Sequence, residues 1–161
     1  MDAEAVDPRH RLVRVILDGE ALTRLSPEQE ADRAQAAADL EAENCFRPGD
    51  RAGPFVLHLS IRDGRLVFDI RDLEDAPLAA VVLALGPFRS LLKDYKLLLD
   101  SHAQAVQEGR EARIQAIDMG RRGLHNEGAT LLTERLHDKI ALDFPTARRL
   151  FTLICALHQR P

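Results

Sequence analysis

Four polar residues in the stretch IQAIDMGRRGLHNEGATLL, at 114–132, have side chains that bind anions or transfer protons: Asp118, Arg121, Arg122 and His125. Arginine donates charge-assisted hydrogen bonds to anions, and histidine exchanges a proton near neutral pH. On a helix of about 100° per residue, Asp118, Arg121 and His125 fall inside the apolar stripe and Arg122 lies at its edge. Because unpaired charge is costly to bury, we expect these side chains to pair, to line a cleft or to hold a ligand.

Three glycines in the same stretch allow two opposite backbone structures. Gly128 falls on the apolar stripe, where a missing side chain would let another backbone approach closely. Gly120 and Gly123 lie off the stripe and could break the helix, so that GRRG forms a turn that cradles an anion. The sequence therefore leaves three interpretations open: a structural polar network, a ligand or active site, or a broken helix with solvated arginines.

A second candidate site lies in the segment PFVLHLSIRDGRLVFDIR, at 54–71. Two alternating apolar runs flank Asp63-Gly64, which is the signal for a two-residue type I′ hairpin. Centring the turn there predicts His58 opposite Asp69. A carboxylate beside an imidazole can orient it and raise its pKa, although such residues are also ordinary on a solvated strand face. His58 and Asp69 are therefore secondary candidates.

The elements that must position these residues predict an α+β fold. We expect an antiparallel β-meander with an additional N-terminal strand, packed against about four helices. The predicted domain covers residues 11–159, after a flexible N-terminus at 1–10. The expected elements are strands at 11–18, 55–62, 65–71, 78–85 and 139–144, and helices at 26–43, 86–109, 112–136 and 145–159.

Composition excludes several functional classes. The chain has 161 residues and a net charge of -4, which argues against a dedicated nucleic-acid partner. It has no long apolar run and no apolar leader, so we expect no membrane segment and a cytoplasmic protein. Cys45 and Cys155 are too few for a disulfide framework and form no Cys-x-x-Cys pair, so we expect no metal site. No phosphate-binding or dinucleotide-binding glycine motif is present, so no cofactor is expected.

Three segments resemble those of a known group of proteins: LHLSIRDGRLVFDIRD, IDMGRRGLHNEGA and DFPTARRLFTLICALH. Together they are similar to uncharacterised protein family 0262, a group of short alphaproteobacterial proteins. The resemblance covers about residues 11–158 and implies a bacterial setting. It implies no activity, cofactor or catalytic residue.

The leading functional hypothesis is a small cytoplasmic binding or regulatory module. It would recognise an anionic small molecule or a protein partner through Asp118, Arg121, Arg122 and His125. The alternatives are an enzyme that uses His125 as acid or base with Arg121 and Arg122 on an anionic substrate, and a structural or scaffold protein. A homodimer is also expected, through the alanine-rich helix from Pro27 and the edge strand at 139–144.

Overall fold

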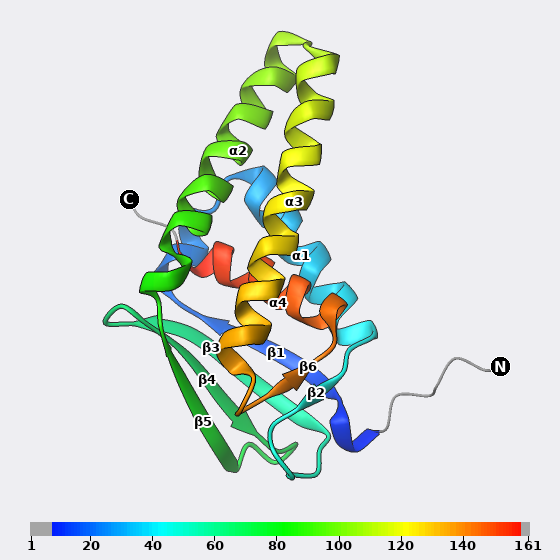
Figure 1. Ribbon diagram of the computed structural model, residues 1–161, viewed down its shortest axis with the longest axis vertical. Coiled ribbons are helices and arrows are strands. Elements are labelled where there is room, and N and C mark those ends of the chain that lie inside the picture. Colours follow the sequence, from blue (N-terminus) through cyan, green and yellow to red (C-terminus); the bar gives the residue numbers. More distant parts are fainter. Residues whose placement is uncertain (1–7, 159–161) are drawn as a thin grey trace, which may run out of the picture.

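The computed structural model describes residues 8–158 and confirms the α+β architecture, with four α-helices stacked on one face of a four-stranded sheet (Figure 1). In chain order the elements are η1 (Pro8–His10), β1 (Leu12–Asp18), η2 (Glu20–Arg24), α1 (Pro27–Ala42), β2 (Phe46–Arg47), β3 (Phe55–Arg62), β4 (Arg65–Arg71), β5 (Pro77–Ala84), η3 (Gly86–Phe88), α2 (Arg89–Glu108), α3 (Glu111–Leu136), β6 (Ala141–Leu142) and α4 (Phe144–Leu157).

The sheet is a three-strand meander to which the N-terminal strand adds at one edge. Its order is β1-β3-β4-β5, with β1 parallel to β3 and the other pairs antiparallel. The chain passes from β1 to β3 through α1, since parallel neighbours need a crossover connection. Eight side chains of the meander are buried beneath the helices: Phe55, Leu57, Leu59, Leu66, Phe68, Ile70, Val81 and Leu83.

The β3–β4 hairpin has the predicted register. His58 pairs with Asp69 and Arg62 with Arg65. Asp63 and Gly64 have φ of 52° and 72°, as a type I′ turn requires. The Asp-Gly turn and the alternation of apolar and polar residues along the two strands therefore determine the register of the hairpin together.

Replacing Gly64 with valine should lower the free energy of unfolding by about 1–2 kcal/mol, because a β-branched residue is strained at positive φ. Urea denaturation measures this loss. Gly64→Asn is the matched control, since asparagine tolerates the left-handed region, and it should lose clearly less. Equal losses in the two variants would contradict this role for the turn.

Helix α1 begins with a capping box. The Ser26 hydroxyl accepts the Gln29 N–H at 3.2 Å, and Gln29 Oε1 accepts the Ser26 N–H at 2.9 Å. The helix buries Ala36 and Leu40 against β1 and α4. Its exposed side carries Ala31, Ala34 and Ala38. The homodimer expected at this surface remains a prediction.

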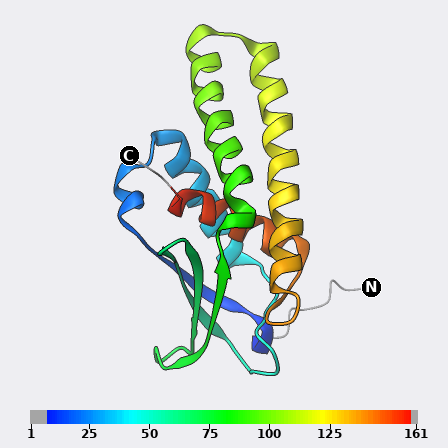
Figure 2. The same ribbon diagram turned by 60° about the vertical axis from the view of Figure 1, so that its left-hand side comes forward.

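Helix α3 is continuous from Glu111 to Leu136, so the broken-helix interpretation is wrong. It forms an antiparallel hairpin with α2 that extends far beyond the sheet (Figures 1 and 2). Gly109 ends α2 in the left-handed conformation, with φ of 69°. Gly128 is buried against Phe151 of α4. The predicted close approach at Gly128 is therefore present, but the neighbour is the Phe151 ring and not another backbone.

Helix α4 lies between the sheet and the other helices (Figure 1). Asp143 caps its start by accepting the Thr146 N–H at 3.0 Å. Its buried surface extends beyond one face, because every residue from Leu150 to Leu157 is buried. Packing on both sides explains why even Thr152 and Cys155 are inaccessible.

Two short segments differ from the predicted elements. The loop expected between α1 and β3 contains β2, which pairs with β6, so the edge strand predicted at 139–144 is reduced to Ala141–Leu142. At the N-terminus, the Arg9 carbonyl accepts the Gly53 N–H at 2.7 Å, which ties η1 to the body. The rest of the predicted flexible segment, at 1–7, lies outside the described residues.

Candidate functional site

Helix α3 brings three of the four leading candidates to its inner side. His125 is buried, Asp118 and Arg121 are half-buried, and Arg122 is exposed. Asp118 accepts a hydrogen bond from Arg121 Nη2 at 3.2 Å, and no ion pair between Asp118 and Arg122 is formed. Arg122 thus lies apart from the other three.

Asp118 and Arg121 belong to a polar network that joins three helices. His102 of α2 lies between two carboxylates, with Nδ1 3.3 Å from Glu28 of α1 and Nε2 3.5 Å from Asp118 of α3. A surface hollow of about 270 Å³ opens here, lined by Glu28, Ala31, Asp32, Gln35, His102 and Arg121. Carboxylates outnumber arginine in and beside this hollow, so its charge does not favour an anion.

The charge pair of Asp118 and Arg121 is only half-buried. The side chains of Asp118 and Arg121 are 36% and 28% exposed, so water screens both charges. An ion pair of this kind contributes about 0–1 kcal/mol. The pair can therefore be structural without being essential to folding.

His125 lies deeper, in a separate group of rings. Its ring centroid is 5.5 Å from that of Tyr95 and 6.3 Å from that of Phe151, and Nε2 is 3.5 Å from the Thr152 hydroxyl. Burial lowers the pKa of His125 to about 4, although the negative charge of Asp32 acts to raise it. His125 is therefore neutral at pH 7, and only 6% exposed. Its use as an acid or base stays a prediction.

Tyr95 connects this group to α1. Its hydroxyl donates a hydrogen bond to the Asp32 carboxylate, and burial raises the pKa of Tyr95 far above its ordinary value, with Cys155 and Asp32 adding to the shift. The phenol thus stays protonated and acts as a donor. The sequence did not indicate this contact, because Asp32 looks like an ordinary surface residue of α1.

The secondary candidates pair in register but form no dyad. Asp69 accepts hydrogen bonds from Arg71 Nη2 at 2.8 Å and Nε at 3.2 Å. His58 Nε2 instead lies 3.3 Å from Asp75 Oδ1, without the alignment of a hydrogen bond. Asp18 and Arg62 pair nearby at 2.9 Å. Most charges on this open face of the sheet are thus already compensated.

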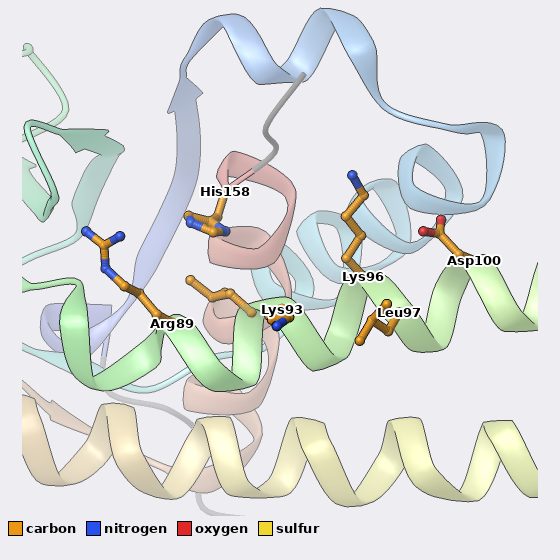
Figure 3. Close-up of a pocket in the computed structure, with 7 residues that line it drawn as sticks. Arg89, Lys93, Lys96, Leu97, Asp100 and His158 are labelled. Atoms are coloured by element: carbon orange, nitrogen blue, oxygen red, sulfur yellow. The ribbon is translucent and has the colours of Figure 1, made fainter.

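A groove on α2, which the sequence did not suggest, is lined by three positively charged side chains (Figure 3). Its volume is about 530 Å³, and its lining residues are Arg89, Leu92, Lys93, Lys96, Leu97, Asp100 and His158. Arg89 and Lys96 extend toward the side on which His158 ends α4 (Figure 3). In the described residues, no ion pair or hydrogen bond engages the side chain of Arg89, Lys93 or Lys96. These cations therefore remain available to a ligand.

The signal for this groove was the spacing of three basic residues. Arg89, Lys93 and Lys96 recur at i, i+4 and i+7, which places them along one side of a helix. Such a row is usually only a solvated face. The groove arises because the end of α4 lies across from it, and this is a tertiary feature.

Comparison with known proteins decides the family. The model of an uncharacterised protein family, UPF0262, matches residues 9–160. The chain belongs to this family. A UPF0262 protein of Granulibacter bethesdensis is 67% identical over 93% of this chain and 90% of its own length. One of Acidiphilium cryptum is 64% identical over 97% of both chains, and one of Rhodospirillum rubrum is 50% identical over 99% and 98%. No solved structure matches the chain.

The description of UPF0262 assigns no activity to the family. No helix in the described part of the chain has both the length and the apolarity to span a bilayer. Within the same residues, no group of three or more His, Cys, Asp or Glu side chains is arranged to hold a metal ion.

Proposed function

We propose that this UPF0262 protein is a small bacterial cytoplasmic binding module for an amphipathic anion, with the α2 groove as its binding site. The ligand is a carboxylate or phosphate attached to an apolar segment. The observation that carries the proposal is the row of unpaired cations Arg89, Lys93 and Lys96 beside Leu92 and Leu97 in one groove. Its volume of about 530 Å³ is in the ordinary range of small-molecule sites.

The charge at the start of α2 supports an anionic ligand. The first turn of α2 has no acidic residue and begins with Arg89, although the positive end of a helix dipole favours carboxylates there. The Phe88 side chain offers no cap. This arrangement is locally unfavourable without a ligand, and an anion in the groove would offset both the dipole and the three cations.

The apolar part of the groove supports an amphipathic ligand over a bare anion. The Leu97 side chain is 54% exposed, next to the buried Leu92. Covering exposed leucine with an alkyl segment contributes about 25 cal/mol per Å². The anionic group would supply orientation, since charge-assisted hydrogen bonds contribute about 1.5–3 kcal/mol each.

Calorimetric titration with decyl phosphate and decanoate tests this function. Both should bind, while decylamine, which has the same alkyl chain and the opposite charge, should not. The double variant Lys93→Gln/Lys96→Gln should weaken binding by about tenfold or more, which corresponds to about 1.4 kcal/mol. Lys139→Gln is the matched control, because Lys139 is the only other lysine of the chain. Equal binding of decylamine, or unchanged affinity in the double variant, would refute the proposal.

The polar hollow at Arg121 and His102 supports a different role. Its charges are paired among α1, α2 and α3, as in a network that fixes the relative positions of three helices. Ligand binding by Asp118, Arg121, Arg122 and His125 remains a prediction, and the α2 groove fits an anion better.

A further inference from the structure

From Ala79 onward, strand β5 is an edge of the sheet without the protection that edges usually have. The segment PLAAVVLAL, from Pro77 to Leu85, has no charged residue, although charged residues make up 30% of the chain. Natural edge strands are commonly short, bulged or charged, because a bare edge pairs with other strands. Val82, in the middle of β5, is a 47% exposed apolar side chain. In Figure 1, β5 is the outermost strand on its side of the sheet.

The backbone groups of β5 that point away from β4 can be assigned from its hydrogen bonds. The Leu85 N–H donates to the Gly64 carbonyl at 3.0 Å, and bonding directions alternate along an antiparallel strand. Ala80, Val82 and Ala84 therefore direct their N–H and C=O groups outward. The outward carbonyl of Leu78, at the start of the strand, accepts Arg51 Nε at 3.0 Å. In the described residues, no hydrogen bond engages the outward N–H and C=O groups of Ala80, Val82 and Ala84.

The opposite edge of the sheet is capped by side chains over its first half. Asn44 accepts the Leu12 N–H and donates to the Leu12 carbonyl, both at 2.7 Å, and it is almost completely buried. Further along β1, Glu41 Oε2 accepts the Val15 N–H at 3.1 Å. The two edges thus differ: β1 has side-chain partners at Leu12 and Val15, and β5 has one at a single end.

We infer that β5 is an interface on which a second copy of this chain pairs through its own β5, antiparallel and around a two-fold axis at Val82. In this register Val82 faces Val82 of the second copy, and Ala80 faces Ala84. The axis lies at Val82 because Arg51 occupies the Leu78 end, which leaves Ala80, Val82 and Ala84 as the outward residues. The two sheets become one continuous sheet.

A second copy is the occupant that the chemistry of β5 fits. A two-fold axis brings each residue near its own equivalent, so a charged strand would repel itself. The uncharged β5 has no such repulsion, and its alanines leave room for close strand approach. The axis also places the two α2 helices at opposite ends of the paired strands, since Gly86 would lie opposite Leu78. This interface differs from the surfaces on which the sequence predicted a homodimer.

Cysteine cross-linking tests both the interface and its register. Paired residues at the axis have Cα atoms about 5.5 Å apart, within the disulfide range. In a Cys45→Ser background, Val82→Cys should therefore give a disulfide-linked dimer on mild oxidation. Ala84→Cys alone should not, because the two copies of residue 84 would lie about 14 Å apart. A mixture of the Ala80→Cys and Ala84→Cys proteins should cross-link.

The oligomeric state of the unmodified protein gives an independent measurement. Light scattering at high micromolar concentration should give twice the chain mass of 18.0 kDa. Val82→Pro removes an outward N–H and no bond to β4, so it should remain folded and become monomeric. Val82→Lys should do the same if the proline is poorly tolerated. A monomeric parent protein, or a dimer that persists in both folded variants, would overturn the inference, as would cross-linking of Ala84→Cys alone.

Discussion

Gly128→Ala should lower the free energy of unfolding by about 3 kcal/mol, at the upper end of the range for overpacking a core. A methyl group at this position would overlap the Phe151 ring, whose Cγ and both Cδ atoms are its nearest neighbours. The overlap cannot be relieved locally, because Phe151 is completely buried in α4. A urea denaturation curve of the variant beside the parent measures the loss.

Gly123→Ala is the matched control in the same helix, and its effect should have the opposite sign. No atom lies within 4 Å of an added methyl group there. The alanine should stabilise the protein by up to about 1 kcal/mol, since glycine is unfavourable in a helix interior. Phe151→Leu should recover part of the loss when combined with Gly128→Ala. If both alanine variants changed stability equally, close packing at Gly128 would be refuted.

The protein should lose about 3 kcal/mol of stability through His125 alone as the pH falls from 6.5 to 4. Burial lowers the pKa of His125 from its ordinary value of 6.5 to about 4 in the folded state. Between these values the unfolded chain takes up a proton that the folded chain does not. His125 therefore makes its full contribution to stability above pH 6.5. This contribution is lost as the pH falls through the folded-state pKa of about 4.

Denaturation curves at several pH values between 7 and 4.5 measure this effect in the parent and in His125→Asn. The variant should show a weaker pH dependence, and a constant loss from repacking cancels when slopes are compared. His137→Asn is the control, because the His137 side chain is 83% exposed, and it should keep the slope of the parent. Identical slopes in the parent and His125→Asn would show that His125 does not titrate as described.

The features that could be predicted from the sequence are those that local chemistry determines. Asp63-Gly64 and two alternating strands were enough for the hairpin and its register, because a one-residue slip would expose the apolar face. Gly128 could be assigned a close contact because it falls on the apolar stripe of α3. Neither inference needed knowledge of a distant segment.

The rest depends on contacts between residues far apart in the chain. His102 lies between Glu28 and Asp118, and nothing near His102 in sequence reveals these partners. Asp118 and Arg121 fall inside the apolar stripe of α3 but are partly exposed, because the α2–α3 hairpin extends far beyond the sheet. The α2 groove was missed for the same reason, since His158 closes it from another helix.

The amide of Asn44 acts as a short substitute for a neighbouring strand, because it bonds the N–H and C=O of Leu12 and also the Leu40 carbonyl. A sheet with two bare edges could add subunits at both sides and grow into a filament. A sheet closed at β1 can add strands at β5 only. Any assembly through its edges would therefore end after one addition, and Asn44 would help to prevent open-ended polymerisation.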